Sequence, residues 1–433
     1  MGLTSKLEKL KLKELTGHEA AVKSNVVNGA DTDDTDDIDE MDNEGQSILM
    51  GIIAQLRPGM DLSRITLPTF ILEKKSMLER ITNFFQIPDM LLKANRTSDD
   101  VERFVSVLAW YLASWHIAPK AVKKPLNPVL GETFNCYWEN ISDDCSAYYI
   151  SEQVSHHPPK SSYFYLVPEA KIKVDGILIP KSRFLGNSSA AMMEGWAHLT
   201  LGEHENEVYE MNQPNVYCRG ILFGKMKMEL GDHMYVKCRK TGLEADIDFK
   251  TKGFISGTYD AIEGVIKNSK TSEVLYQITG KWNEVMEIKD LKTGKKRVLV
   301  DTKSSVPVKP RVRPLEEQGQ YESRKLWKPT IDALARRDHT VATEEKFAVE
   351  DEQRNLAKKR IDDGVEFHPK FFRPVNEKEV ELQDLEYVIY KKFDLKSNPE
   401  VLTNEVLSIA PILPGQKHDE KFEIPAFKKH EET

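Results

Sequence analysis

The residues best suited to chemistry in this chain form one short segment, Glu152-Gln153-Val154-Ser155-His156-His157-Pro158-Pro159. It lies between two aromatic runs, Tyr148-Tyr149-Ile150 and Tyr163-Phe164-Tyr165, that are typical of β-strands. Adjacent histidines on a strand point to opposite faces, although the prolines that follow can turn the chain and re-aim them. The pair alone leaves three roles open: a structural role, anion binding, and metal binding or catalysis.

The segment lacks the neighbours that metal binding or nucleophilic catalysis usually requires. A zinc site needs further ligands, and the chain has no His-Glu-x-x-His pattern. Ser155 beside His156 is not set in a Gly-x-Ser-x-Gly elbow, and no Walker A loop for nucleotide phosphates occurs. We therefore predict no catalytic residue, no metal and no cofactor.

A second candidate is the turn Lys123-Lys124-Pro125-Leu126-Asn127-Pro128. Two lysines on a proline-framed turn offer donors to a phosphate group, and Asn127 adds a side-chain amide. Exposed lysines near prolines also commonly face only water. The turn by itself therefore indicates an anion site weakly.

A third candidate is a helical face formed by Lys346, Glu350 and Arg354. Their spacing of four residues places them on one side of a helix, where one carboxylate could hold two cations in position. A solvated ladder of salt bridges explains the same spacing. Both interpretations stay open on the spacing alone.

Helices are expected on both sides of a strand-rich centre. Residues 76–118 have a helical pattern, with Thr97 or Ser98 as the cap of a helix whose apolar stripe runs from Val101 to Trp115. Helix packing explains that stripe without a ligand. From about Pro314 the chain returns to a charged helical pattern and then to a mixed tail.

The centre of the chain, residues 119–305, has the alternation of apolar and polar residues that predicts β-strands. Turn signals separate these runs at Gly231-Asp232, Thr241-Gly242 and Thr293-Gly294. Because no helix-length pattern lies between them, successive strands are expected to be antiparallel neighbours. So many strands with one apolar face favour closure into a barrel, and a large barrel can hold a ligand cavity.

The N-terminal region, residues 1–45, is polar and is expected to be disordered. Its acidic groups concentrate in residues 31–44, and without this run the rest of the chain is close to neutral. An apolar helical face then ends before Pro58-Gly59; it consists of Ile48, Leu49, Ile52, Ile53 and Leu56. This helix is either docked on the core or acts as a membrane-sensing lid.

Composition excludes several classes of protein. No apolar run approaches the roughly 18 residues of a membrane span, and the N-terminus has no apolar core for secretion. The local acidity argues against a nucleic-acid binder. The four cysteines have no disulfide or zinc spacing, so we predict reduced thiols in the cytosol; they are Cys136, Cys145, Cys218 and Cys238.

Together, the three candidate segments resemble the lipid-binding domain of the oxysterol-binding-protein-related family, and the run from Glu152 to Pro159 is highly specific to that family. The resemblance extends from about residue 46 to the C-terminus. Three further runs are similar to the fungal subgroup that exchanges phosphatidylserine for phosphatidylinositol 4-phosphate: Gln55-Leu56-Arg57-Pro58-Gly59, Leu72-Glu73-Lys74-Lys75-Ser76-Met77-Leu78-Glu79-Arg80 and Phe184-Leu185-Gly186-Asn187-Ser188-Ser189-Ala190-Ala191-Met192-Met193.

The resemblance implies a mainly β fold with flanking helices (α+β). It is a large, incompletely closed antiparallel β-barrel with a central lipid tunnel, an N-terminal lid helix and a C-terminal helical region. A disordered acidic tail, 1–45, would precede one lipid-binding domain, 46–433. Within this domain, the resemblance implies a lid and the segment after it at 46–75, helices at 76–118, the barrel at 119–305, and C-terminal helices and a tail at 314–433.

The resemblance also implies binding residues. The site for the phosphoinositide headgroup would comprise Lys124, Pro125, Leu126, Asn127, His156, His157, Lys346, Glu350 and Arg354. The lid that covers the lipid would comprise Ile52, Ile53, Ala54, Gln55, Leu56, Arg57, Ile65 and Leu67. Contacts to phosphatidylserine would come from Asn127 and Ser182.

The implied function is lipid transfer without catalysis. One lipid at a time would occupy the tunnel, so binding of phosphatidylinositol 4-phosphate would expel phosphatidylserine. We expect a cytoplasmic protein at contacts between endoplasmic reticulum and plasma membrane, with transient binding to anionic membranes, a possible protein tether and no nucleic-acid partner. The alternatives are a sterol in place of phosphatidylserine, a lipid hydrolase using His156 or His157, and a lipid-sensing regulator.

Overall fold

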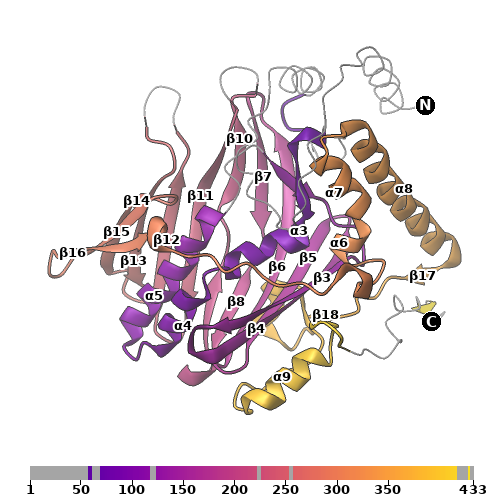
Figure 1. The fold of residues 1–433 in the computed structure, drawn as a ribbon. Helices are drawn as coiled ribbons and strands as arrows, with labels where there is room; N and C mark the ends of the chain where they lie inside the picture. Colours follow the sequence, from indigo (N-terminus) through magenta and orange to yellow (C-terminus); the bar gives the residue numbers. More distant parts are fainter. Residues whose placement is uncertain are drawn as a thin grey trace.

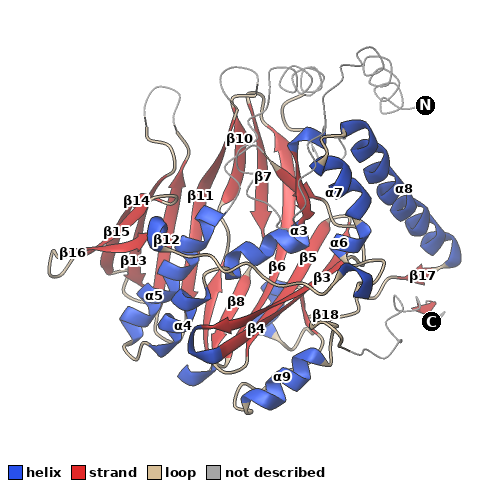
Figure 2. Cartoon of the chain, in the orientation of Figure 1, coloured by secondary structure: helices blue, strands red, loops and turns tan. Residues whose placement is uncertain are grey.

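The computed structural model describes residues 57–60, 69–117, 123–221, 226–252 and 257–416, and the backbone of 428–429. The predicted acidic tail and the lid helix before residue 57 lie outside these residues. The centre of the described chain forms one 14-stranded sheet with helices along its sides (Figure 1, Figure 2). None of the described helices is long and apolar enough to cross a membrane.

The strands of this sheet follow one another through the middle of the chain. They are β3 (Thr133–Ile141), β4 (Cys145–His156), β5 (Pro159–Val167), β6 (Ile172–Phe184), β7 (Ser188–Glu194), β8 (Ala197–Leu201), β9 (Glu207–Met211), β10 (Asn215–Arg219), β11 (Lys227–Cys238), β12 (Leu243–Lys250), β13 (Ala261–Asn268), β14 (Val274–Lys281), β15 (Val285–Asp290) and β16 (Lys296–Asp301).

The sheet has two ends, β3 and β16, and every pair of neighbouring strands in it is antiparallel. Side chains from both ends join one apolar cluster with α4 (Pro88–Arg96) and α5 (Asp100–Ala113). A sheet whose ends share a core must curve around it. The predicted incomplete antiparallel barrel is therefore confirmed.

A strap crosses the gap between the two ends of the sheet. After β16, the chain runs past α4 and then along β3 (Figure 1). The indole Nε1 of Trp138 donates to the Val308 carbonyl at 2.7 Å, and the backbones of Tyr137 and Arg311 exchange hydrogen bonds at 3.0 and 2.8 Å. These bonds pair polar groups on the outer edge of β3, which would otherwise lack hydrogen-bond partners at this end of the sheet.

The wall of the barrel divides between β6 and β11. One half of β6 pairs with β7, which continues through β10 to the first half of β11. The other half of β6 pairs with β8, which continues through β9 to the second half of β11. The two routes leave a split in the sheet where the connections β7–β8 and β9–β10 meet.

The turn predicted at Gly231-Asp232 is wrong. Both residues lie inside β11, at the point where β11 stops pairing with β10 and begins to pair with β12. Asp232 has a φ of 69°, so the local signal marks an irregular strand residue and not a hairpin. The turns predicted at Thr241-Gly242 and Thr293-Gly294 are confirmed between β11 and β12 and between β15 and β16.

Helices α3 (Met77–Arg80), α4 and α5 lie within residues 77–113, in the region where helices were predicted, but the cap of α5 is not the predicted one. The side chain of Asp99, and not Thr97 or Ser98, accepts hydrogen bonds from the backbone of Val101 and Glu102 at 3.1 and 2.9 Å. The carbonyls of Thr97 and Ser98 instead accept from the buried guanidinium of Arg103. A buried guanidinium needs hydrogen-bond acceptors, and this need fixes the conformation of the backbone at Thr97 and Ser98 before the helix.

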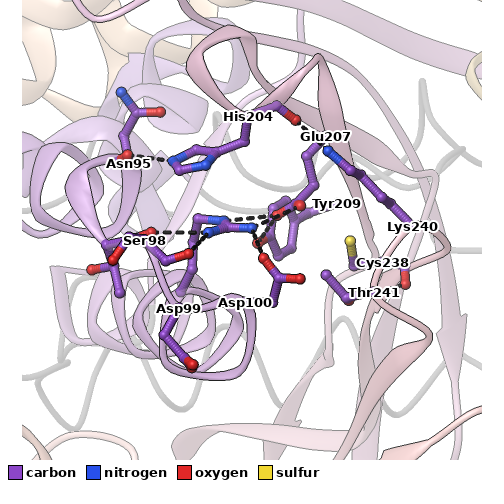
Figure 3. Close-up of polar contacts among 12 residues, drawn as sticks. Asn95, Ser98, Asp99, Asp100, His204, Glu207, Tyr209, Cys238, Lys240 and Thr241 are labelled. Atoms are coloured by element: carbon purple, nitrogen blue, oxygen red, sulfur yellow. Dashed lines mark hydrogen bonds and ion pairs between the residues drawn. The ribbon is translucent and has the colours of Figure 1, made fainter.

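Arg103 joins α5 to the barrel, where its partner Glu207 lies beside Tyr209 (Figure 3). Its Nε and Nη2 donate to the two carboxylate oxygens of Glu207 on β9, each at 2.9 Å. Both side chains are almost fully buried, and the hydroxyl of Tyr209 donates to the same carboxylate. This network therefore fastens the helix to the end of the barrel away from the histidine pair.

The C-terminal region covers the outer face of β3 to β5. An apolar cluster joins these strands to β18 (Phe372–Pro374), β19 (Tyr387–Ile389) and α9 (Pro399–Leu407). The remaining helices lie beside β1 (Leu72–Ser76), which pairs in parallel with β2 (Lys124–Leu126). They are α3 (Met77–Arg80), α6 (Ser323–Leu326), α7 (Lys328–Ala335) and α8 (His339–Asp363).

Candidate lipid headgroup site

The two histidines lie at the tip of the hairpin between β4 and β5. His156 pairs with Pro159 at the end of the ladder, and the ring centroids of His156 and His157 are 4.5 Å apart. His157 is exposed, whereas His156 is partly buried and its Nδ1 makes no hydrogen bond within the described residues. A buried ring nitrogen without a partner can accept or donate a hydrogen bond to a ligand.

Burial lowers the pKa of His156 to about 4, with a further contribution from the neighbouring His157 and from Arg360. The backbone at Pro128 acts in the opposite direction. The ring is therefore neutral at neutral pH. A bound phosphate group would supply a negative charge that stabilises the protonated form of His156.

The first half of the motif is structural. The carboxylate of Glu152 is fully buried and accepts from the backbone amides of Lys370 and Phe371, both at 2.8 Å. Burial raises the pKa of Glu152 to about 7, against the lowering effect of these amides. Gln153 accepts from the Ser161 hydroxyl at 2.6 Å. These bonds fix the base of the hairpin, so its tip has a defined position.

The loop after β2 is held against this hairpin. Gly131 donates its backbone amide to the Gln153 carbonyl, and the Gln153 amide donates to the Glu132 carbonyl, both at 2.9 Å. The buried carboxylate of Glu132 in turn accepts from the Ser323 hydroxyl at 2.7 Å and from the Trp327 indole at 3.0 Å. The segment with Lys124 and Asn127 thus lies next to the histidine hairpin.

Helix α8 contacts the same loop. The side chain of Gln353 accepts from the Leu130 backbone amide at 2.6 Å, and Val349 lies in an apolar cluster with Leu126 and Val129. The three predicted segments are therefore neighbours in space although they are far apart in sequence. Gln353 lies one helical turn beyond Val349, and as a neutral residue it gives no sign in the sequence that it holds the loop.

The charges on α8 only partly follow the expected arrangement. The Lys346 ammonium lies 2.5 Å from Glu350, as the helical spacing predicts. Arg354 instead pairs with Asp351 at 3.2 Å and lies over the ring of Phe347, 5.1 Å from its centroid. The prediction that Glu350 holds both cations is wrong here, because a closer carboxylate and an aromatic face compete for Arg354.

The remaining predicted binding residues are placed as follows. Lys124 and Asn127 are exposed and Leu126 is buried. Ser182 lies on β6, two residues before Phe184, whose backbone pairs with Gly59 and Met60. Arg57 belongs to that exposed turn. The other lid residues, Ile52 to Leu56, Ile65 and Leu67, lie outside the described residues. Binding by this set stays a prediction.

No group of three or more side chains able to hold a metal ion occurs in the described ranges. The polar groups of the candidate site are two imidazoles, the ammonium groups of Lys124 and Lys346, the guanidinium of Arg354, the Asn127 amide and the Glu350 carboxylate. Such a set suits a phosphate ester with hydroxyl groups.

Comparison with known proteins identifies the chain. A model of the oxysterol-binding protein family matches residues 51–333. The chain belongs to the oxysterol-binding protein family. It is 69% identical over 431 residues to the oxysterol-binding protein-like protein OBPalpha of Candida albicans, with 100% of both chains covered. It is 60% identical over 395 residues to oxysterol-binding protein homolog 6 of Saccharomyces cerevisiae, covering 90% of this chain and 86% of that protein.

Solved structures of oxysterol-binding proteins share the fold. The Osh1 ORD domain in complex with cholesterol has a TM-score of 0.66 at 23% identity, over 90% of this chain and 95% of that one. The Osh3 ORD in complex with PI(4)P has a TM-score of 0.58 at 21% identity, over 83% of this chain and 92% of that one. The family membership identifies this chain as a lipid-binding protein of a lipid-transfer family.

The low pKa of His156 has a measurable consequence for stability. Its pKa of about 4 in the folded chain lies below the ordinary 6.5, so the folded state binds fewer protons between these values. The contribution of the neutral His156 ring to the free energy of unfolding is complete above pH 6.5 and is lost as pH falls toward 4. When pH is lowered from 7 to 5, the free energy of unfolding measured in urea should fall by about 2 kcal/mol more in wild type than in His156→Gln.

A variant at another histidine provides a control of opposite sign. A hydrogen bond to Asp246 raises the pKa of His233, so its contribution is present at low pH and is lost as pH rises. His233→Gln should therefore lose stability relative to wild type at low pH. Parallel pH profiles for wild type and His156→Gln would show that His156 is not buried as a neutral ring.

Proposed function

We propose that this chain transfers phosphatidylserine between endoplasmic reticulum and plasma membrane in exchange for phosphatidylinositol 4-phosphate, without catalysing a reaction. The observation that carries the proposal is the meeting of the histidine hairpin, the Lys124–Asn127 loop and α8. Donors on three separate elements can surround a headgroup that carries several charges and hydroxyls. A phosphoinositide has this chemistry.

Phosphatidylserine as the second lipid is supported by the runs that resemble the fungal exchangers, and by the position of Ser182 beside the turn at Gly59. Its headgroup needs hydrogen bonds more than bulk positive charge, which agrees with Asn127 and Ser182 as ligands. Competition of both lipids for one cavity would couple their transfer. The proposed location is the cytoplasmic side of contacts between the two membranes, with transient binding to their anionic surfaces.

A sterol is the second candidate cargo. The Osh1 domain with the same fold was solved with cholesterol, and the fold therefore accommodates a sterol in at least one relative. The two candidates share the phosphoinositide site and differ only in the lipid that it displaces. A lipid-sensing regulator would bind the same lipids but exchange them slowly.

Transfer between two populations of liposomes tests the proposal. Donor liposomes carry fluorescent phosphatidylserine or a fluorescent sterol, and acceptor liposomes contain or lack phosphatidylinositol 4-phosphate. We expect the phosphoinositide to speed phosphatidylserine transfer and to move in the opposite direction in equal amount. A rate that does not respond to the phosphoinositide would contradict exchange, and transfer of the sterol alone would assign the other cargo.

A further inference from the structure

The turn between β15 and β16 carries a dense run of basic residues. The segment 287–298 contains five basic and two acidic residues, and every residue from 291 to 298 is exposed. Figure 1 shows the turn projecting from the side of the barrel, at the left of the view. A methyl group on Gly294 would meet no other atom within 4 Å, so the tip is convex and open. None of the predicted headgroup or lid residues belongs to this basic turn.

Both acidic residues of the basic turn have partners of their own. The Glu287 carboxylate lies 2.5 Å from the Lys296 ammonium. The Asp290 carboxylate accepts hydrogen bonds from the backbone amides of Lys292 and Thr293 at 2.8 and 3.0 Å, which fixes the shape of the turn. Neither carboxylate forms an ion pair with the remaining lysines.

Those lysines are Lys289, Lys292 and Lys295, which form no ion pair within the described part of the chain. Lys289 also lies directly opposite Lys296 across the two strands. Like charges in this position destabilise a sheet. The barrel therefore keeps a concentration of positive charge here at a cost to its own stability, and an anionic partner would remove that cost.

Two apolar side chains are exposed among these lysines. Leu291, at the start of the turn, is 44% exposed, and Val298 on β16 is 57% exposed. A single exposed apolar side chain is common in proteins. Apolar side chains interspersed with lysines are instead typical of segments that enter the boundary between headgroups and acyl chains of an anionic membrane.

The basic turn lies at the end of the strands opposite to the histidine hairpin. Neighbouring strands alternate in direction along the path from β4 through β7 and β10 to β16. The tip between β4 and β5 and the turn between β15 and β16 therefore fall at opposite ends of the strands. A chain held by the basic turn would keep its headgroup site directed away from the surface that holds it.

We propose that the basic turn docks the chain on an anionic membrane surface at the end of the barrel away from the headgroup site. The ammonium groups pair with lipid phosphates and carboxylates, and Leu291 enters the headgroup boundary. A nucleic acid fits less well, because its binding relies on arginine and aromatic side chains, and Arg297 is already paired with Glu102. A convex tip also offers no groove to a peptide. This contact adds a second membrane surface to lipid exchange and does not depend on it.

A fluorescent reporter in the turn tests the contact. In the full chain with the half-buried Cys218 replaced by serine, Thr293→Cys is labelled with a dye whose emission shifts to the blue in apolar surroundings. Vesicles contain phosphatidylcholine alone or with about 30% phosphatidylserine. We expect a blue shift only with the anionic vesicles, and a weaker shift as salt is raised. The same dye on Glu400→Cys, on α9, should show no shift.

A triple variant of the turn measures its contribution to binding. Lys292→Gln, Lys295→Gln and Leu291→Ser together should weaken binding to the anionic vesicles at least about tenfold, as measured by flotation. Binding of a soluble short-chain phosphoinositide should be unchanged, because no residue of the headgroup site is altered. Failure of this proposal is thereby distinguished from failure of the proposed lipid exchange.

A matched triple variant removes the same charge from the C-terminal region. It combines Lys378→Gln, Lys396→Gln and Val401→Ser, of which Val401 is 42% exposed, close to the value for Leu291. This variant should change vesicle binding by less than about twofold. An unshifted dye at Thr293, an equal loss in both triple variants, or a blue shift with polyglutamate but not with anionic vesicles would overturn the proposal.

Discussion

Replacing His156 and His157 together by alanine is expected to lower extraction of phosphatidylinositol 4-phosphate from liposomes about 100-fold. Hydrogen bonds to a charged group contribute about 1.5–3 kcal/mol each, and about 1.4 kcal/mol corresponds to a tenfold change in affinity. Extraction of phosphatidylserine should change by less than about threefold, since its predicted ligands lie on other elements. The measurement is the amount of each lipid that remains with the protein after liposomes are removed.

Ser182→Ala provides the reciprocal control. It is expected to weaken phosphatidylserine extraction by about 3–10-fold, the effect of one neutral hydrogen bond, and to leave the phosphoinositide unchanged. If the double histidine variant lost both lipids equally while its unfolding midpoint fell, the histidines would be structural and the headgroup site would lie elsewhere.

Removing the Arg103 side chain is expected to be the most destabilising single change considered. In Arg103→Ala the Glu207 carboxylate stays buried without its cation, which costs about 3–5 kcal/mol. The Thr97 and Ser98 carbonyls also lose their donor. Urea unfolding at neutral pH measures the loss, and lipid extraction by the protein that remains folded should be retained.

The matched control is another ion pair on the same helix. Arg297 on β16 lies 2.6 Å from Glu102 on α5, but both side chains are nearly half exposed. Arg297→Ala should therefore cost at most about 1 kcal/mol. A similar loss in both variants would mean that α5 is fastened by its apolar face and not by the buried pair.

The barrel could be predicted because its signals are local. Alternating apolar residues in β12 and the turn at Thr241-Gly242 each act within a few residues, and the structure follows them. The signal at Gly231-Asp232 was misleading, since the same residue types serve a hairpin and a strand irregularity. Only the change of partner from β10 to β12 separates the two, and that change depends on strands far along the chain.

The candidate site was predictable for a different reason. The histidine motif is specific enough to indicate the family from one sequence, and the resemblance then assigned the other two candidate segments to the same site. Charge spacing alone failed at Arg354, because Asp351 forms the ion pair with it and the ring of Phe347 lies against its guanidinium. The role of Gln353 was not predictable, since a neutral residue on α8 gives no sign that it bonds to Leu130.

Identification of the bound lipid tests the central claim most directly. The protein is purified from the type of cell that makes it, and native mass spectrometry counts and identifies the lipids that it retains. The account predicts one intact phosphatidylserine per chain, which is displaced when phosphatidylinositol 4-phosphate is added. Lysolipid products, a sterol that the phosphoinositide displaces in place of phosphatidylserine, or a chain that retains no lipid would contradict it.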